Sequence, residues 1–397
     1  METPEDGLYL SADEAASILG VSLATLYAYV SRKNIRSLKV DGSRSRRYWA
    51  ADIQRLAKPK YDVITTVAEP PRIAGSSAIT LLTDKGLYYR GHDVAQLAAS
   101  ASVEEVAELM WQAPGAFGDT LPKRPKAATP LLKAFAEMHP VEKAIALFPL
   151  IERENPKAYD LSPEGYARTG VDVVRWMAAL MVGADGPSTQ PLPAFIVSTL
   201  GVDHAFEDLA RRVLILSMDH ELDPSTFTVR AAANTGVTPY YAAITGLCSF
   251  RGRRLAYSRG ETVGRLLEEI CIAQDPQAPV LQRYREGEAI PGFGSNVHGV
   301  ADPRAQSLWS TLEGMFAGDI EFQRLVKAAQ IAQELLQQPP DFILLLSFVG
   351  RKLKLEGREL ALPAVGRVIG WLAHASEQYH HQSLVRPRAK YTGPLPD

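Results

Sequence analysis

The chain has 397 residues, of which 46% are hydrophobic and 22% are charged, as is usual for a globular protein of two or three domains. Its formal net charge of −2 excludes a general attraction to nucleic acid or anionic membranes, so any such binding has to come from a local patch. The two cysteines, Cys248 and Cys271, are too few for a disulfide framework and predict a reducing compartment.

The sequence shows no convincing pattern for a targeting peptide, a membrane span or a metal site. Residues 1–6 carry three acidic side chains and no basic one, unlike a secretory or transit peptide. No apolar run approaches the roughly 18 residues that a membrane span needs. His380 and His381 lack a third ligand at a zinc spacing. We therefore expect a cytoplasmic protein with no membrane partner, no metal and no resident cofactor.

The first predicted elements are two short helices joined by a tight turn. Ser11 and Glu14 have the spacing of a capping box, and Gly20 is placed to end the first helix in a left-handed conformation. Ser22 then caps a second helix. Its inward residues are expected to be Leu23, Leu26 and Val30, and its outward residues Thr25, Ala28, Tyr29 and Arg32.

A basic hairpin is predicted next. A strand over residues 35–40 meets the turn dipeptide Asp41-Gly42, residues 46–49 return as its partner, and a short helix follows over residues 52–57. Between residues 32 and 47 there is one acidic residue, Asp41, against seven basic ones: Arg32, Lys33, Arg36, Lys39, Arg44, Arg46 and Arg47. Such a local patch can hold phosphates on a chain that is otherwise slightly acidic.

The run YLSADEAASILGVSLATLYAYVSRKNIRSLKVDGSRSRRYWAADIQRLA resembles the winged helix-turn-helix of the MerR and excisionase type. The resemblance implies a domain over residues 1–58 that binds duplex DNA, with the second helix in the major groove. The implied DNA-binding residues are Thr25, Tyr29 and Arg32 on the helix and Arg44, Arg46 and Arg47 on the wing. A dimer reading paired half-sites is the natural arrangement. The alternative is a protein-contact module whose basic hairpin is only solvated.

Beyond residue 60 the pattern becomes mainly helical. A segment of β-branched residues with turn signals covers residues 63–89. Amphipathic segments of helix length follow. They include residues 103–112, 130–138, 141–152, 165–182, 208–218, 239–250, 263–272, 305–316, 322–336 and 363–378, and an extended tail is expected over residues 386–397.

Six motifs in order make this region similar to citrate synthase. They are GLYYRG from Gly86, HELDPSTFTVRAAANT from His220, GFG followed by DPRA between Gly292 and Ala305, PDF from Pro340, GRVIGWLAH from Gly366 and RPRAKYTG from Arg386. The resemblance implies a mainly α fold with large and small helical domains over residues 59–397, the small one roughly at 225–335, and a homodimer with its active cleft between these domains.

The family condenses acetyl-CoA with oxaloacetate, and the resemblance assigns roles to this chain's residues. Asp341 stands at the position of the base that deprotonates the acetyl methyl group. His220 stands at the position that contacts the oxaloacetate carbonyl. Arg304, Arg367 and Arg386 stand at the carboxylate-binding positions, with Arg386 reaching into the site of the second subunit. Guanidinium groups suit this task because they bind carboxylates in a bidentate manner.

Two catalytic histidines of the family are replaced. Leu255 falls at one of these positions, and Ser295 at the one that directly follows Gly-Phe-Gly. Leucine donates no hydrogen bond and serine is a weaker donor than imidazole. Losing an enolate donor costs about 10²–10³ in rate and losing a proton donor about 10²–10⁴. Asn296 and Gly299 replace basic residues that help to hold coenzyme A, while His298 is three residues away from the position it would have to fill.

Three functions remain open at the level of the sequence. The favoured hypothesis is a DNA-binding regulator whose citrate-synthase-like domain binds a di- or tricarboxylate, such as oxaloacetate or citrate, and condenses little or nothing. The second is a working synthase on acetyl-CoA or another acyl-CoA, with acetyl-CoA as a co-substrate only in that case. The third is a scaffold that merely pairs two DNA readers. Retained Asp341 favours the second, and the replaced histidines favour the first or third.

Overall fold

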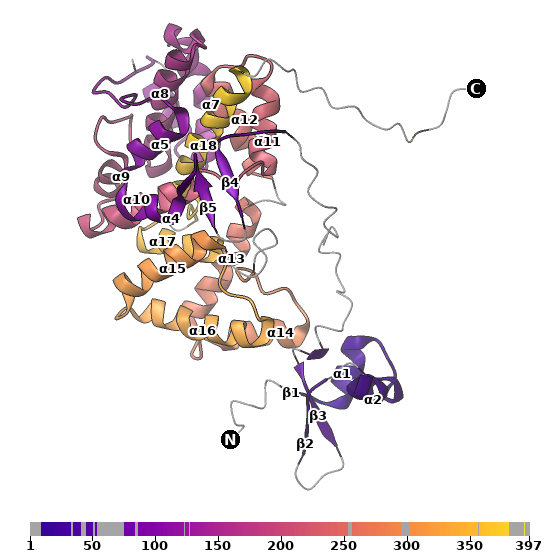
Figure 1. Ribbon diagram of the computed structural model, residues 1–397. Helices are drawn as coiled ribbons and strands as arrows, with labels where there is room; N and C mark the ends of the chain where they lie inside the picture. Colours follow the sequence, from indigo (N-terminus) through magenta and orange to yellow (C-terminus); the bar gives the residue numbers. More distant parts are fainter. Residues whose placement is uncertain are drawn as a thin grey trace. The chain divides into compact units, whose positions relative to one another are not determined.

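The protein is mainly helical, as predicted, with two small antiparallel sheets (Figure 1). The computed structural model describes residues 9–32, 35–40, 45–50, 52–53, 75–83, 86–122, 124–126, 128–252, 256–294, 302–355, 357–380 and 393, with the backbone alone at 31–32 and 256–258. The chain divides into two compact units. Unit 1 comprises Met1–Ala74, Thr262–Ala305 and Leu312–Leu344, and unit 2 comprises Gly75–Glu261, Gln306–Thr311 and Leu345–Asp397.

The N-terminal part of unit 1 contains the predicted helix pair and hairpin. Its elements are β1 (Tyr9–Leu10), α1 (Ala12–Leu19), α2 (Leu23–Arg32), β2 (Ser37–Lys39) and β3 (Arg46–Trp49), with sheet order β1-β3-β2. The capping box forms, because Ser11 Oγ accepts from the Glu14 amide at 3.2 Å and Glu14 accepts from the Ser11 amide at 2.8 Å. Gly20 adopts φ 65°, the left-handed conformation that ends α1.

The core of this module is smaller than the sequence predicted. Leu26 on α2 and Tyr48 on β3 are fully buried, and helix α1 packs on both α2 and β3. Leu23 was expected to pack inward but is 38% exposed, since it lies in the first turn of α2, beyond the end of α1. The hairpin register pairs Leu38 with Arg47 and Lys39 with Arg46. Of the short helix predicted over residues 52–57, the described residues 52–53 are helical.

The rest of unit 1 is built from helices. They are α13 (Ala256–Ile272), α14 (Ala278–Glu286), α15 (Pro303–Phe316), α16 (Ile320–Leu336) and the first residues of α17 (Phe342–Lys352). The middle of α15 and most of α17 group with unit 2. Helices α14 and α16 pack on each other. Gly292 to Gly294 run beside Pro339 to Asp341, with a β-bridge between Phe293 and Pro340.

Unit 2 begins with the second small sheet, β4 (Thr80–Leu82), β5 (Leu87–Tyr89) and β6 (His92–Asp93), in that order. Its helices then follow in the chain. They are α4 (Val94–Ser100), α5 (Val103–Trp111), α6 (Ala128–Ala134), α7 (Pro140–Arg153), the 3-10 turn η2 (Pro156–Tyr159), α8 (Pro163–Val182), α9 (Leu192–Leu200), η3 (His204–Phe206), α10 (Glu207–Ser217), α11 (Pro224–Ala233), α12 (Pro239–Phe250) and α18 (Ala361–His380).

Helix α18 is the centre of unit 2 and is nearly all buried from Ala361 to Ala375. It contacts α5, α7, α8, α10, α11 and α12, which surround it (Figure 1). Two glycines bring α10 close to it. A Cβ on Gly370 would lie 2.0 Å from the Met218 carbonyl oxygen, and one on Gly366 would lie 2.5 Å from that of Leu214. These glycines position the buried side chains of α18 against the segment that follows α10.

The predicted helical segments all have counterparts among the observed helices. Two of them begin two residues earlier than predicted because a Ser or Asp cap followed by proline starts the helix. They are α8, which begins at Pro163 after Ser162, and α15, which begins at Pro303 after Asp302. No helix within the described residues is long and apolar enough to cross a membrane.

The small domain at about residues 225–335 stays a prediction. Contacts group α11 and α12 with unit 2, and unit 1 resumes at Thr262. The reason is packing: α11 and α12 lie against each other and against α18. An amphipathic helix pattern in the sequence cannot indicate which neighbour buries its apolar face.

Candidate functional site

Helix α2 carries Thr25 and Tyr29, two of the residues predicted to contact DNA. Ser22 caps it, and the Ser22 and Thr25 hydroxyls lie 3.0 Å apart, so Thr25 is engaged in the cap. Thr25 and Tyr29 are half-buried, whereas Tyr27 is 54% exposed. Sequence reasoning missed Tyr27, although its spacing from the buried Leu26 places it on the outer face. The side chain of Arg32 lies outside the described residues.

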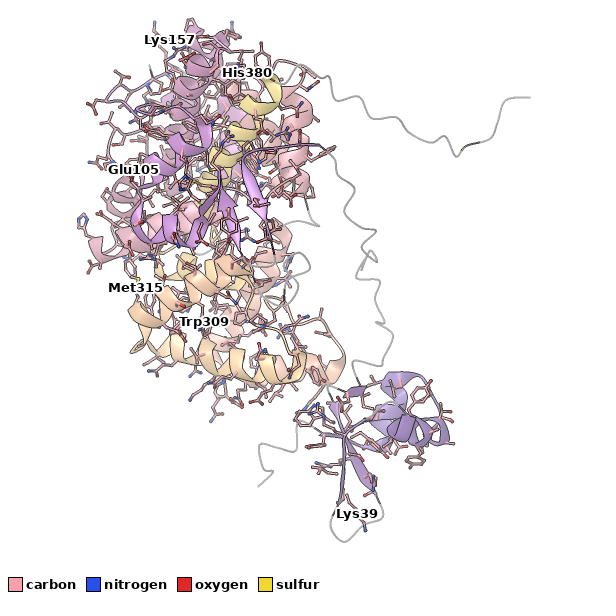
Figure 2. The ribbon with its side chains drawn as sticks, in the orientation of Figure 1. Lys39, Glu105, Lys157, Trp309, Met315 and His380 are labelled. Atoms are coloured by element: carbon pink, nitrogen blue, oxygen red, sulfur yellow. The ribbon has the colours of Figure 1, made fainter. Side chains whose placement is uncertain are left out.

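Strands β2 and β3 carry the basic surface. Arg46 is exposed and its guanidinium donates to Ser37 Oγ at 3.1 Å, while Arg47 is half-buried. Lys39, which Figure 2 labels on the hairpin, pairs across the strands with Arg46. Arg44 lies outside the described residues. The described part of the hairpin thus places three cations on two adjacent strands, a pattern that suits contacts with phosphates.

Arg36 has a different role from its basic neighbours. Its guanidinium forms a bidentate pair with Asp52 at 3.0 and 3.2 Å, its backbone amide donates to the same carboxylate at 2.9 Å, and it lies over the Trp49 ring at 4.8 Å. The Asp52 hydrogen bond raises the pKa of Arg36. This arginine therefore ties the hairpin to the start of the following helix and does not add to the charge available for phosphates.

In unit 2 the helix α18 carries Arg367, one of the predicted carboxylate-binding residues. Its guanidinium lies 3.4 Å from Asp219 Oδ1, donates to Thr226 Oγ1 at 2.8 Å and forms an ion pair with Asp223. The side chain is 8% exposed and stacks over Trp371, one turn along the helix, at 5.6 Å. The protein's own carboxylates therefore already hold this arginine.

Asp219 is fully buried and lies at the centre of a polar network. Its carboxylate accepts from Thr80 Oγ1 at 2.5 Å and lies 3.0 Å from His374 Nε2, and its backbone amide donates to the Tyr89 hydroxyl at 2.9 Å. Burial alone would raise the pKa of Asp219, but His374, Arg367 and Thr80 together lower it well below the usual value. Asp219 is therefore ionised, and it holds Arg367 and His374 on one face of α18.

The network continues to the beginning of unit 2. His374 Nδ1 lies 3.1 Å from the Arg230 guanidinium, which pairs with Glu377 at 2.5 Å and donates to the Ser76 carbonyl at 3.1 Å. Glu377 also accepts from the Ala78 amide at 2.8 Å. Contiguous contacts thus run from Arg367 to residues 76–78, close to the point where the described part of unit 2 begins.

His220 directly follows Asp219 and is half-buried, and the next residue, Glu221, has φ 59°. The Glu221 amide donates to the Asp219 carboxylate at 3.1 Å, which closes a tight turn around His220. The structure therefore places Arg367 against the carboxylate of Asp219, the residue that precedes His220 in the chain. Sequence reasoning missed Asp219, Asp223 and His374, although Asp223 and His374 lie within the motifs that it quoted and Asp219 directly precedes one of them.

In unit 1 the predicted base Asp341 is 5% exposed and precedes α17. Its carboxylate accepts from the Leu344 amide at 2.9 Å, and its own amide donates to the Gly292 carbonyl at 2.8 Å. Arg304, at the start of α15, pairs with Asp302 at 2.7 Å and lies over the Phe342 ring at 4.7 Å. Phe342 adjoins Asp341, so the predicted base and one predicted arginine lie in one neighbourhood.

Several predicted residues cannot be placed. Ser295, Arg386, Leu255, Asn296, His298 and Gly299 lie outside the described residues. Asp341 and Arg304 belong to unit 1, and His220 and Arg367 belong to unit 2. Among the described residues, no group of three or more His, Cys, Asp or Glu side chains could hold a metal ion.

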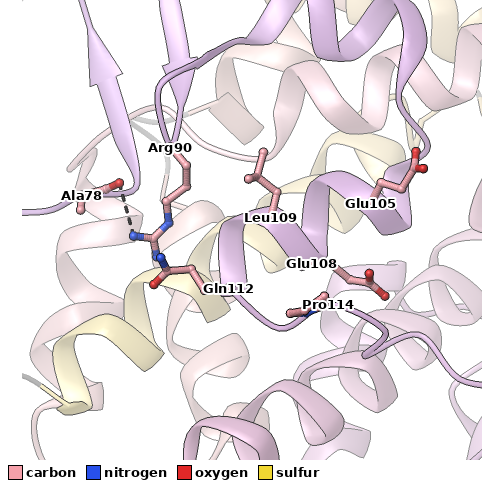
Figure 3. A pocket seen from close by; sticks show the side chains of 7 residues that line it. All are labelled: Ala78, Arg90, Glu105, Glu108, Leu109, Gln112 and Pro114. Carbon is pink, nitrogen blue, oxygen red and sulfur yellow. Dashed lines mark hydrogen bonds between the residues drawn. The ribbon is translucent and has the colours of Figure 1, made fainter.

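A surface pocket of about 730 Å³ lies within unit 2 (Figure 3). Its charged groups already serve the fold. Arg90 donates to the carbonyls of Met110, at 3.0 Å, and Ala78, at 3.4 Å, and Glu108 accepts from two backbone amides of the loop after α5. No predicted site residue lines this pocket, which is formed by Ala78, Arg90, Glu105, Glu108, Leu109, Gln112 and Pro114.

Comparison with known proteins agrees with both parts of the chain. Residues 72–388 match the family described as "Citrate synthase, C-terminal domain", and residues 9–60 match "Helix-turn-helix domain". Among relatives, Citrate synthase 2 of Bacillus subtilis is 26% identical over 81% of this chain and 94% of its own length. Citrate synthase of Haloferax volcanii is 29% identical over 77% of this chain and 89% of its own length.

Solved structures agree on the fold. Citrate synthase from Thermoplasma acidophilum, solved as a ternary complex with carboxymethyl coenzyme A and oxaloacetate, has a TM-score of 0.70 at 21% identity, over 81% of this chain and 94% of its own. Citrate synthase from Thermotoga maritima has a TM-score of 0.61 at 23% identity, over 82% and 95%. The chain belongs to the citrate synthase family and carries a helix-turn-helix domain N-terminal to the family region.

Proposed function

We propose that this protein is a DNA-binding regulator whose citrate-synthase domain binds a di- or tricarboxylate and catalyses little or no condensation. The observation that carries the proposal is the combination in one chain of two features. A helix-turn-helix module carries exposed cations on β2 and β3, Lys39 and Arg46, and the citrate-synthase domain lacks both expected histidines. The DNA-contacting residues in this proposal are Thr25, Tyr29, Arg32, Arg44, Arg46 and Arg47.

The case against substantial catalysis rests on Leu255 and Ser295. A hydrocarbon side chain cannot stabilise the developing enolate, and each missing donor is worth orders of magnitude in rate. Asn296 and Gly299 offer no charge to the phosphates of coenzyme A. Asp341 and Ser295 are the residues that would remain for chemistry, together with His220.

The case for carboxylate binding rests on Arg304, Arg367, Arg386 and His220. Arginine side chains bind carboxylates through two parallel hydrogen bonds, and each charge-assisted bond contributes about 1.5–3 kcal/mol. Arg367 and Arg304 are held in defined positions by Asp219 and Asp302. Preorganised cations of this kind favour a small polyanion over a diffuse surface interaction.

A homodimer fits the surface of unit 2. Between Pro224 and Phe250 the sequence has a single charged residue, Arg230, and that residue is buried. The outer faces of α11 and α12 expose Phe227 and Tyr241, at 39% and 42%. An uncharged face with exposed aromatic residues is typical of a protein–protein contact. Pairing of two chains would supply two DNA readers for paired half-sites, and we place the domains at residues 1–58 and 59–397.

A second candidate function is an active citrate synthase, or a synthase on a related acyl-CoA, with the N-terminal module as an accessory. Two observations favour it. Asp341 is buried and held by backbone hydrogen bonds beside Arg304 and Phe342, as a positioned base would be. The relatives named citrate synthase also align over most of their own length.

The test is DNA binding by the intact protein in the presence and absence of carboxylates. Duplexes are first selected from a random library, and their affinity is then measured by fluorescence anisotropy with and without millimolar citrate or oxaloacetate. A regulator should bind a selected duplex, and the ligand should change the affinity by about 5–150-fold. If duplex binding is undetectable at low salt, the N-terminal module is a protein-contact module. If the protein binds duplex with an affinity that neither carboxylate changes, the citrate-synthase domain is a scaffold that only pairs two DNA readers.

A further inference from the structure

Asp223 lies on the outer side of Arg367. Its Oδ2 pairs with Arg367 Nη2, and Thr226 Oγ1 accepts from the same nitrogen at 2.8 Å. Of the three charged side chains here, Asp219 is fully buried, Arg367 is 8% exposed and Asp223 is 28% exposed. A ligand arriving from solvent therefore meets the carboxylate of Asp223 before it meets the guanidinium.

The hydrogen-bond geometry makes this contact a competing one. A guanidinium Nη atom has two hydrogens, and a bidentate carboxylate needs one from each of two nitrogens of the fork. At Arg367 both Nη2 hydrogens are already directed at Asp223 and Thr226. A ligand carboxylate can take this nitrogen only after Asp223 has left it.

The charge balance acts in the same direction. One guanidinium is shared by two carboxylates, Asp219 and Asp223, so these three groups sum to one negative charge. Like charges a few ångströms apart repel in a partly buried site. Asp219 is fixed by Thr80, Tyr89 and His374, whereas Asp223 is the more exposed of the two carboxylates and meets Arg367 through Oδ2 alone.

We propose that Asp223 acts as an internal competitor for Arg367 and thereby determines how tightly this site holds a di- or tricarboxylate. This inference rests on the proposed carboxylate site. In the unliganded protein the Asp223 carboxylate forms the ion pair with Arg367. A bound ligand displaces it, so the affinity measured is the difference between the two interactions.

Asp223 also has a structural task that can be kept. Its Oδ1 caps α11 by accepting from the Ser225 and Thr226 amides at 2.8 and 2.9 Å. Asparagine is an equally good N-cap residue, so Asp223→Asn preserves the cap and removes only the charge that pairs with Arg367. The matched control is Asp93→Asn, which changes the N-cap of α4, where the aspartate accepts from the Gln96 amide at 2.9 Å.

The experiment is calorimetric titration of citrate and oxaloacetate into the full-length wild type, Asp223→Asn and Asp93→Asn, with thermal melting of each. Asp223→Asn should bind at least about tenfold more tightly than the wild type, the equivalent of one charge-assisted hydrogen bond. Asp93→Asn should bind like the wild type. Binding that is detectable only in Asp223→Asn supports the inference in its strongest form.

Two results would overturn it, and they have different meanings. If the wild type binds carboxylates and Asp223→Asn binds equally or more weakly while melting normally, Asp223 does not compete, and the proposed carboxylate site stands. If neither protein binds either carboxylate, the site does not take anions, and the carboxylate part of the proposed function fails as well.

Discussion

Asp172 is a half-buried acidic residue on α8 whose ionisation opposes folding. Burial raises its pKa to about 6, and a hydrogen bond from Asn155 together with the charge of Arg175 offsets part of that effect. Because the folded pKa exceeds that of an unfolded aspartate, this group's contribution to stability is present in acid and is lost as the pH rises through about 6. The residue therefore costs stability at neutral pH.

Replacing this carboxylate should show that cost directly. Asp172→Asn keeps an acceptor for Asn155 and cannot ionise, so we expect its Tm to exceed that of the wild type by about 2–4 °C at pH 7.5. The two Tm values should converge only below the pKa of an unfolded aspartate, about 3.9. Calorimetric melts across this pH range measure the difference. Asp185→Asn, an exposed aspartate, should change neither melt, and a gain that is independent of pH would show that ionisation of Asp172 is not the cause.

At the scale of elements, helix α18 depends on glycines for its approach to α10. Gly370→Ala places a methyl group against the Met218 carbonyl, so it should lower the free energy of unfolding by about 1–3 kcal/mol. Gly314→Ala is the matched control, because a Cβ there would meet nothing within 4 Å and α15 gains helix propensity. Denaturant titration of both variants provides the test, and equal stabilities would mean that α10 and α18 do not approach each other closely.

The basic hairpin should act as an element that binds phosphates irrespective of sequence. Changing Arg44, Arg46 and Arg47 together to alanine should weaken binding to every duplex, because each side chain that neutralises a phosphate releases a counterion. The slope of the logarithm of affinity against the logarithm of salt concentration should fall by about one for each phosphate that the variant no longer neutralises. Anisotropy titrations at several salt concentrations measure this slope.

A control variant removes the same charge elsewhere. Arg153, Lys157 and Arg168 are exposed in unit 2, and their replacement by alanine should leave the slope unchanged. Equal loss of affinity in the two triple variants would mean that net charge, and not the hairpin, governs binding. Arg36 is left in place because its interactions with Asp52 and Trp49 hold the module together.

At the scale of the whole molecule, a condensation assay distinguishes an active synthase from a regulator. We expect a thiol-release assay with acetyl-CoA and oxaloacetate to give a rate at or barely above background, because Leu255 and Ser295 cannot replace two imidazoles. A turnover on the order of 10 per second, the median for enzymes, would establish the synthase instead. Asp341→Asn is the control, since it should abolish any genuine condensation and leave contaminating thiol release unchanged.

Contacts within unit 2 connect Arg367 to residues 76–78. The residues involved are Asp219, His374, Arg230 and Glu377, all in unit 2. Arg230 contacts both His374 and Glu377 in the middle of these contacts. A variant at Arg230 is therefore the one in which the dependence of DNA affinity on citrate should be measured.

The sequence determined those features of this protein that depend on neighbours along the chain. Capping boxes join residues three positions apart, as at Ser11 and Glu14 or at Ser102 and Glu105, so the helix starts and the helix-turn-helix were predictable. Family motifs such as HELDPSTF and GRVIGWLAH were equally visible, and with them the positions of His220 and Arg367.

Only the tertiary structure decided which charged groups meet. Arg367 and Asp219 are 148 positions apart, and they meet because Gly366 and Gly370 let α18 approach α10. Arg36 forms a salt bridge with Asp52, so it does not contribute to phosphate binding although it belongs to the basic residues counted in the sequence. The physical reason is that a salt bridge depends on the distance between two atoms after packing, and a periodic pattern predicts that a face is buried without specifying its partner.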